Sequence, residues 1–367
     1  MRLTYFGPLP PHPGGISQHG HNVAAAAVAC GHHVQRLSWR RLYPQRLYPG
    51  SLTDPDADPG ATTRYVADWH RPSTWSRVIR LAQQGDGLVM PWVTAFHAPT
   101  FDYVLRRKRG LPAIAIVHNA LPHERHVGDV AIARRCLSRL DGAVVHAHTV
   151  GQQVAHLAPG LDIRVVPHPP NLQLETRQLP GPDPLRLLVF GYVRAYKGLE
   201  LALDAVARIS GRGVNVRLSV VGQFWEPIEW WQETVQERDL DDVVVLDDRY
   251  VPDSEVDHLF AAHHIVLAPY RSATQSGIVP LARAAGRPVV ATDVGGITEG
   301  ISQGQDGWTV PPGDAVAMAD RVLEVAEDLQ RYADASSRRA AKWEEVVTAI
   351  VELIHLPGSQ TSRAPRG

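Results

Sequence analysis

Short apolar runs alternate with longer segments of helical period along most of the chain. The runs are rich in Val, Ile and Leu, and segments such as "GLELALDAVARIS" (198–210) separate them. Continuous apolar runs of this length are typical of strands buried on both faces, which occur in parallel sheets covered by helices. The pattern therefore predicts an α/β protein built from doubly wound parallel sheets.

The predicted strands form two groups on either side of a proline-rich segment. The first group is 3–6, 34–37, 88–90, 113–117, 143–145 and 163–166; the second is 186–190, 217–221, 243–246, 265–268 and 288–291. Helical periodicity stops and prolines cluster in "PHPPNLQLETRQLPGPDP" (167–184), which predicts a boundary there. We expect domains at 1–172 and 186–339, a linker at 173–185, a helix at 340–356 and a disordered tail at 357–367.

The composition suits a globular two-domain protein. A chain of 367 residues is long enough for about two hydrophobic cores. No run of apolar residues is long enough to span a bilayer, and "MRLTYFGPLP" lacks the apolar region of a secretion signal. The cysteines, Cys30 and Cys136, have no metal-binding spacing. We therefore expect a bacterial, cytoplasmic protein with two plain thiols.

The small net charge conceals an asymmetry between the halves. Residues 1–172 carry 18 Lys and Arg against 10 Asp and Glu, whereas the remainder carries 19 against 28, for a net charge of −1. The basic half could face an anionic acceptor, the inner surface of a membrane as a peripheral contact, or the acidic half. Nucleic acid is not expected, because no basic and aromatic stripe runs through a recognisable nucleic-acid fold.

The stretch "FGYVRAYKGLE" (190–200) carries the clearest candidate chemistry. A strand runs into Gly191, and Arg194 and Lys197 follow before Gly198 and a helix; the chain's other lysines are Lys108 and Lys342. An arginine fork and a mobile ammonium group at the start of a helix can bind the oxygens of a diphosphate. The alternative is a pair of solvated turn residues.

Two further glycine-containing segments could approach a phosphate group. Gly14 and Gly15 lie between the first predicted strand and an alanine-rich helix, although G-x-G-x-x-G is absent. Thr274, Gln275, Ser276 and Gly277 lead into another helix, whose first N–H groups could bind phosphate. A simple tight turn remains the alternative for the paired glycines.

Together these segments resemble the family-4 retaining glycosyltransferases of the GT-B fold. The matching pieces are "GG" (14–15), "GH" (31–32), "VHN" (117–119), "FGYVRAYKG" (190–198), "GRPVVATDVGGITEGI" (286–301) and "GWTVPPGD" (307–314). The resemblance spans nearly the whole chain. It implies two facing Rossmann-like domains, an N-terminal acceptor domain and a C-terminal donor domain, and a C-terminal helix around Trp343 that crosses back onto the first domain.

The resemblance also implies roles for individual residues. Arg194 and Lys197 would bind the donor diphosphate, Gly15 would approach a donor phosphate, and His118 would lie by the reacting sugar. The remaining expected contacts are Gly14, Thr274, Gln275, Ser276 and Gly277 with the donor, and His19, Asn119 and Glu124 with the acceptor. The donor would be a nucleotide diphosphate-sugar, with a UDP- or GDP-sugar expected, and no cofactor or metal is required.

The chain departs from the family at a pair of glutamates. Counting back from "GRP", these positions fall at Ala273 and Leu281, and a shift by one residue gives Thr274 and Ala282. The hydroxyl and amide groups of Thr274 and Gln275 would have to substitute near the sugar. A silent nucleotide-sugar-binding subunit and a GT-B epimerase are therefore alternatives to the transferase. A dinucleotide oxidoreductase ranks last, because neither half has the glycine fingerprint.

Other candidate features have structural interpretations. "HERH" (123–126) and "HAH" (146–148) lack the spacing of two metal ligands on one helical face. In "SWRRLYPQRLYPG" (38–50), arginines interleave with Trp39 and Tyr43. This stretch is an ordered surface loop, an acceptor-recognition segment or a membrane-docking segment. The acceptor could be a small molecule, a glycan or a lipid-linked compound, and the sequence leaves the oligomeric state open.

Overall fold

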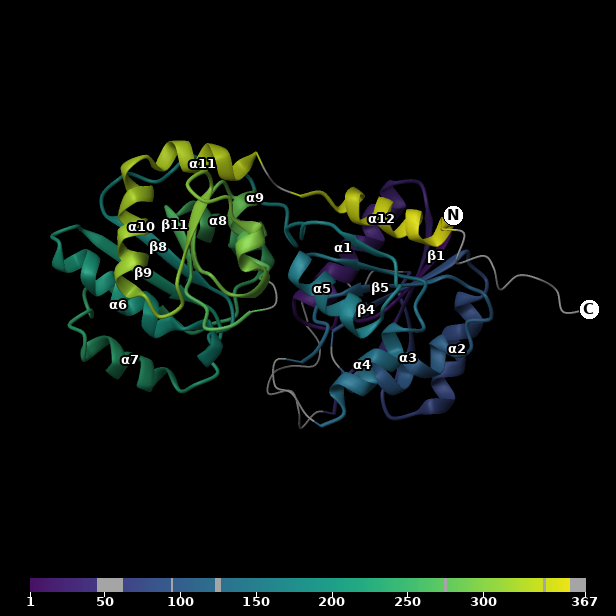
Figure 1. Ribbon diagram of the computed structural model, residues 1–367. Helices are drawn as coiled ribbons and strands as arrows, with labels where there is room; N and C mark the ends of the chain where they lie inside the picture. The colour runs from purple at the N-terminus through teal and green to yellow at the C-terminus, as the bar shows by residue number, and fades with distance from the viewer. Residues whose placement is uncertain (45–61, 94, 123–126, 274–275, 339–340, 357–367) are drawn as a thin grey trace, which may run out of the picture. The chain divides into compact units, whose positions relative to one another are not determined.

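A computed structural model describes residues 1–44, 62–93, 95–122, 127–273, 276–338 and 341–356. The chain divides into two compact units (Figure 1). The first comprises Met1–Pro167 and Lys342–Gly367, and the second comprises His168–Ala341. Each unit is described by itself.

The first unit contains a seven-stranded sheet in the order β3-β2-β1-β4-β5-β6-β7. Its strands are β1 (Arg2–Phe6), β2 (His33–Arg41), β3 (Arg64–Asp68), β4 (Gly87–Trp92), β5 (Ala113–Val117), β6 (Gly142–Val145) and β7 (Ile163–Val165). Every neighbouring pair is parallel. The strand order reverses where β1 pairs with both β2 and β4, which makes this the topological switch point.

Two layers of helices cover this sheet. The helices are α1 (Gly15–Ala29), α2 (Pro72–Ala82), α3 (Ala98–Leu105), α4 (Asp129–Leu137), α5 (His148–Leu157) and α12 (Trp343–His355). The apolar residues of α1 and α12 share one core with alternate residues of β1, β5 and β6. The residues of α2 to α5 form the other core. Figure 1 shows α1 and α12 together on one side of the unit.

The second unit repeats this plan with six parallel strands in the order β10-β9-β8-β11-β12-β13. The strands are β8 (Leu185–Phe190), β9 (Val216–Val221), β10 (Val244–Asp247), β11 (Ile265–Ala268), β12 (Val289–Thr292) and β13 (Gly307–Val310). Here the order reverses at β8, which pairs with β9 and β11. This unit therefore has its own switch point.

The helices of the second unit also divide between two faces. They are α6 (Leu199–Gly211), α7 (Ile228–Gln236), α8 (Asp253–Ala261), α9 (Ile278–Ala284), α10 (Ala315–Glu327) and α11 (Leu329–Ser337). Residues of α6, α7 and α10 pack in one core, and residues of α8 and α9 pack in the other. Burial on both faces explains why the strands read as continuous apolar runs.

The predicted fold class is confirmed: both units are Rossmann-like parallel sheets, and α12 packs within the first unit. Two strands were missed, β3 ("RYVAD") and β13 ("GWTV"), and both lie at sheet edges. An edge strand has one neighbour and tolerates polar residues, so its sequence lacks a long apolar run. No helix in the described ranges is both long and apolar enough to cross a membrane.

Candidate functional site

The predicted phosphate-binding turn lies at the carboxyl end of β8. Arg194 precedes the 3-10 turn η3 (Ala195–Lys197), and Gly198 joins that turn to α6. Because β8 is the strand at which the order reverses, Arg194 and Lys197 lie at the switch point of the second sheet. Ligands of doubly wound proteins bind at this place.

An aromatic ring and a carboxylate support the Arg194 turn. The guanidinium carbon of Arg194 lies 3.9 Å from the ring centroid of Trp225, in the loop that follows β9. The neighbouring Glu226 accepts a hydrogen bond from the Ala195 N–H through Oε1 at 3.1 Å. Stacking on an indole orients a guanidinium group and leaves its N–H groups available for an anion. Sequence reasoning did not identify Trp225.

The ammonium group of Lys197 lies close to Gly191, the residue that follows β8. Its Nζ lies 5.2 Å from the Tyr270 ring centroid and would be 3.3 Å from a Cβ atom added to Gly191. Gly198 has a φ of 64°, and a Cβ atom there would be 2.2 Å from the carbonyl oxygen of Pro269. Glycine is therefore required at 198, since both the backbone conformation and the close approach exclude a side chain.

The two cations of this turn have no carboxylate partner among the described residues. Neither Arg194 nor Lys197 takes part in an ion pair with another described residue. The nearby Arg271, in contrast, pairs with Glu200 at 2.9 Å. Cations without a carboxylate partner at a switch point can bind an anion. This arrangement fits the predicted binding of a diphosphate.

His118 lies in a buried aromatic cluster of the first unit. It follows β5, is 6% exposed, and packs edge-on against His19 of α1 at 4.5 Å between ring centroids. Trp343, the first residue of α12, also packs edge-on against His19, at 4.7 Å between ring centroids. Residues distant in sequence therefore fix the ring of His118.

The hydrogen bonds of this cluster determine which ring nitrogens carry protons. His146 Nδ1 lies 2.9 Å from the Val166 carbonyl oxygen, which can only accept, so Nδ1 carries the proton in neutral His146. Its Nε2 then accepts from His19 Nε2 at 2.8 Å. His19 is 1% exposed and engaged in this pair. These contacts give it a positioning role toward His118; its predicted contact with the acceptor stays a prediction.

Gly14 and Gly15 line a cavity at the switch point of the first sheet. The cavity has a volume of about 170 Å³. Its wall comes from the β1–α1 loop and first turn of α1, the end of β2, the end of β4 and α3: Pro8, Pro13, Gly14, Gly15, Ile16, Ser17, Trp39, Leu42, Tyr43, Pro91, Val93, His97 and Phe101. Gly14 has a φ of 97°, which a glycine adopts without strain.

The aromatic residues of this cavity pack against one another. The ring of His97 lies 4.7 Å from the ring of Trp39 and 5.0 Å from that of Tyr43. Burial lowers the pKa of His97 to about 4; the hydrogen bond from its Nε2 to the Leu42 carbonyl opposes this shift, and His12 adds to it. Burial also raises the pKa of Tyr43. Both side chains are therefore uncharged at neutral pH.

The other predicted site residues have simpler surroundings. Ser276 Oγ accepts from the Ile278 N–H and donates to Tyr270 Oη, each at 3.3 Å, so it supports the start of α9 beside Gly277. Asn119 follows His118 and is partly buried. Thr274, Gln275 and Glu124 lie outside the described residues.

The two positions where the family carries glutamates are apolar and packed. Ala273 and Leu281 pack against the core beneath α9, and Ala282 is fully buried. Their side chains offer no hydrogen-bonding group for a ribose or a sugar.

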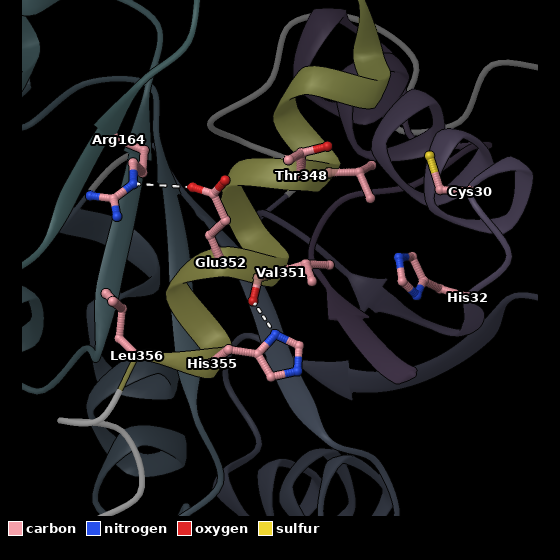
Figure 2. Close-up of a pocket in the computed structure, with 9 residues that line it drawn as sticks. Cys30, His32, Arg164, Thr348, Val351, Glu352, His355 and Leu356 are labelled. Carbon is pink, nitrogen blue, oxygen red and sulfur yellow. Dashed lines mark hydrogen bonds and ion pairs between the residues drawn. The ribbon is translucent and has the colours of Figure 1, made fainter.

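A second, open groove of the first unit is lined by none of the predicted site residues. Figure 2 shows it between α12, His32 and Arg164, with Glu352 paired to Arg164 at 3.5 Å and His355 donating to the Val351 carbonyl at 2.9 Å. Cys30, at its rim, is an exposed free thiol. The charged side chains of this groove, Arg164 and Glu352, pair with each other, so it lacks the uncompensated charge of the Arg194 turn.

Comparison with known proteins relates both units to glycosyltransferases. Residues 184–328, which make up most of the second unit, match the family described as "Glycosyl transferases group 1". The chain is 27% identical to D-inositol 3-phosphate glycosyltransferase of Paenarthrobacter aurescens, over 48% of this chain and 44% of that protein. It is 24% identical to glycogen synthase of Mycobacterium tuberculosis, over 96% of this chain and 93% of the relative.

Solved structures reproduce the fold over almost the whole chain. Sucrose-phosphate synthase from Thermosynechococcus elongatus has a TM-score of 0.74 at 18% identity, covering 96% of this chain and 98% of that one. Anabaena Alr3699/HepE in complex with UDP has a TM-score of 0.73 at 16% identity, covering 96% and 99%. The fold is therefore that of the GT-B glycosyltransferases. Some relatives are matched over less than half their length.

Proposed function

We propose that this protein is a retaining glycosyltransferase that transfers a sugar from a nucleotide diphosphate-sugar to an acceptor. The observation that carries the proposal is the pair of uncompensated cations, Arg194 and Lys197, at the switch point of the second sheet. The group 1 match over residues 184–328 includes this turn. HepE, a structural neighbour, was solved with UDP, which makes a UDP-sugar the first donor to test.

The two cations would act on the leaving group. When a glycosyl–phosphate bond breaks, negative charge develops on the diphosphate while the sugar becomes oxocarbenium-like. Fixed cations that meet this charge lower the barrier, and the loss of one such contact typically costs about 2.7–4 kcal/mol. In the proposed mechanism Arg194 and Lys197 supply the neutralisation that a metal ion supplies elsewhere. We therefore expect a chelator to leave the rate unchanged.

The retaining outcome would follow from a same-face attack. The acceptor oxygen would form its bond to the anomeric carbon on the face from which the diphosphate departs, and its proton would pass to a phosphate oxygen. His118 would contact the reacting sugar, with His19 and His146 holding its ring. No protein base is needed in this sequence of steps.

Donor turnover tests the proposal. The purified chain is incubated with UDP- and GDP-sugars, alone and with acceptor panels, and release of the nucleoside diphosphate is measured with and without a chelator. We expect release from a preferred donor, a retained anomeric configuration by NMR, and a loss of roughly 100-fold in Arg194→Ala or Lys197→Ala. Release that requires a metal ion would overturn the proposed metal independence. A product with inverted anomeric configuration would overturn the proposed retaining mechanism.

A second candidate is a catalytically silent nucleotide-sugar-binding subunit. The apolar, packed side chains at the two family glutamate positions, Ala273 and Leu281, favour it. Such a protein would bind the donor without releasing a nucleoside diphosphate. A GT-B epimerase would instead change the sugar of the donor in the absence of any acceptor, which the same incubation would reveal.

A further inference from the structure

The two helical layers of the first unit carry opposite charge. One layer contains α2, α3 with the residues that follow it to Arg109, and α4 with the residues that follow it to Arg139. These stretches carry 9 Lys and Arg against 2 Asp and Glu, whereas α1 and α12 carry 3 Glu and no Lys or Arg. Figure 1 shows α2, α3 and α4 side by side, away from α12. We call the outer surface of these three helices and their C-terminal extensions the basic face.

Most of the positive charge on the basic face is uncompensated. Five of its exposed arginines form no ion pair with another described residue: Arg77, Arg80, Arg107, Arg109 and Arg134. Such a surface repels itself, and it attracts anions from solution. The basic face therefore carries charge that no partner within the described chain balances.

A second group of arginines shares a single carboxylate. The carboxylate of Asp102 on α3 pairs with three guanidinium groups at 2.9–3.5 Å, those of Arg106, Arg135 and Arg139. Arg135 and Arg139 reach Asp102 from α4, so the surfaces of α3 and α4 are continuous here. One negative charge balances one of the three positive charges, which leaves this cluster available to a further anion.

The helix dipoles do not account for this pattern. A helix is stabilised by cations in its last turn and by carboxylates in its first turn. Arg80 and Arg134 lie in the last turns of α2 and α4. The first turns of α2 and α3 contain no acidic residue, however, and Asp129 in the first turn of α4 is buried. Helices adapted only to their dipoles would present both signs of charge to solvent.

Aliphatic side chains are exposed beside these cations. Val127 is fully exposed, and Val130 and Ile132 of α4 are 42% and 39% exposed. Peripheral membrane surfaces combine these two features, because cations meet anionic headgroups while apolar groups enter the boundary between headgroups and acyl chains. A surface for single-stranded nucleic acid would instead combine cations with aromatic rings that stack on bases. The combination on α4 therefore favours a lipid surface.

We propose that the basic face is a docking surface for an anionic lipid bilayer. Its arginines bind lipid phosphate groups, since one guanidinium group can hold two phosphate oxygens. Val127, Val130 and Ile132 enter the headgroup region. Charge and a few aliphatic side chains together give reversible binding, not a permanent anchor. The inference goes beyond the proposed transferase function and does not depend on it, because a bilayer can hold the chain whatever reaction it performs.

Vesicle flotation of the full chain tests the charge of the docking surface. Vesicles with equal amounts of phosphatidylglycerol and phosphatidylcholine are compared with phosphatidylcholine alone at low ionic strength. The variant Arg80→Gln/Arg109→Gln/Arg134→Gln removes one cation from each helix or its extension. It should bind the anionic vesicles roughly 100-fold more weakly, because each cation near the surface contributes about a factor of 5.

A control variant removes the same charge elsewhere. Arg208, Arg212 and Arg217 are exposed residues of the second unit. Arg208→Gln/Arg212→Gln/Arg217→Gln should bind anionic vesicles as the wild type does, and unfolding curves show that both triple variants are folded. Equal losses in the two variants would mean that net charge, and not the basic face, determines binding.

A matched pair of labels tests which helical layer meets the lipid. The Cys30→Ser background removes the exposed thiol. A polarity-sensitive nitrobenzoxadiazole label on Val130→Cys should shift its emission to the blue on anionic vesicles. Val28 of α1 lies in the other layer and is 51% exposed against 42% for Val130, so a label on Val28→Cys should not shift.

Three results would overturn the inference. The first is equal loss of vesicle binding in the two triple variants. The second is a label at position 28 that shifts as much as the label at position 130. The third is a wild-type chain that does not bind anionic vesicles but binds poly(U) RNA or heparin, which would assign the basic face to a soluble polyanion.

Failure of this inference is distinguishable from failure of the proposed function. Vesicle binding is measured without a donor, and nucleoside diphosphate release from a soluble donor is measured without vesicles. The variant Arg80→Gln/Arg109→Gln/Arg134→Gln should therefore lose vesicle binding and retain release. Release without vesicle binding in the wild type would remove only the docking surface, whereas vesicle binding without release would remove only the transferase.

Discussion

At the scale of single residues, the stacking of Arg194 on Trp225 gives a direct prediction. Trp225→Ala should weaken nucleoside diphosphate binding about 3- to 10-fold, because a cation–π contact contributes about 0.5–1 kcal/mol at exposed sites and also orients the guanidinium. Trp225→Phe should retain most of the affinity. Titration calorimetry with UDP and GDP measures the effect.

The chain offers a matched control for Trp225. Trp230 is 47% exposed against 48% for Trp225, and it does not stack on Arg194. Trp230→Ala should leave the dissociation constant unchanged. If both alanine variants lose affinity equally, the contact to Arg194 is not the cause.

The buried His97 predicts a pH dependence of stability. Its pKa is about 4 in the folded chain against about 6.5 unfolded, so below pH 6.5 the unfolded state binds more protons. Stability contributed by neutral His97 is therefore lost as the pH falls from 6.5 towards 4, amounting to about 2 kcal/mol at pH 5. Urea unfolding of wild type and His97→Gln at pH 7 and pH 5 should show a smaller loss in the variant. Equal losses would contradict the assignment.

Some residues of the candidate sites can be predicted from the sequence alone, and others cannot. Arg194 and Lys197 are candidates from the sequence because one short turn carries both cations and its flanking glycines; their role stays a prediction. Trp225 supports Arg194 from the loop after β9, and the cavity collects residues from Pro8 to Phe101. Such contacts depend on strand order, which local patterns do not encode. The sequence shows that residue 19 is a histidine, but it does not show that the His19 side chain is buried and hydrogen-bonded to His146.

At the scale of elements, the join between η3 and α6 is a constrained stretch of backbone in the proposed donor site. Gly198→Ala should destabilise the chain by about 2–4 kcal/mol, since it combines a left-handed backbone with a close approach to the Pro269 carbonyl. It should also displace Lys197. Chemical unfolding and UDP binding measure the two effects.

The glycine at the other end of α6 provides the comparison. Gly211 is the last residue of α6 and has no atom within 4 Å of an added Cβ. Gly211→Ala should therefore be neutral or stabilising by up to about 1 kcal/mol, through helix propensity. A similar loss of stability in both variants would contradict the role given to Gly198.

The same scale shows why the interior strands and two of the edge strands, β7 and β10, were predictable, whereas the edge strands β3 and β13 were not. Strands such as β5 and β11 are buried on both faces and read as uninterrupted apolar runs. β3 and β13 lie at edges, where polar residues interrupt the run. Period and composition identify a strand when apolar residues fill most of its positions, and they miss one such as β3 or β13, in which polar residues and glycine break a short run.

At the scale of the whole molecule, the charge asymmetry predicts a salt-dependent surface interaction. Residues 1–172 carry a formal excess of 8 positive charges. We expect the chain to float with liposomes containing anionic lipid at low ionic strength and to dissociate as salt screens the attraction. Neutral liposomes are the control. If the chain does not float at low salt, or floats equally with neutral liposomes, the prediction of membrane contact is wrong.

The central claim is that two uncompensated cations at the switch point of the second sheet bind a diphosphate. Titration calorimetry of UDP and GDP against wild type, the Arg194→Ala/Lys197→Ala double variant and Arg271→Ala tests it most directly, because Arg271 is a neighbouring cation already paired with Glu200. Each charge-assisted bond contributes roughly 1.5–3 kcal/mol, so the double variant should bind at least about 100-fold more weakly. Arg271→Ala should bind nearly as the wild type does. A double variant with wild-type affinity would contradict the account.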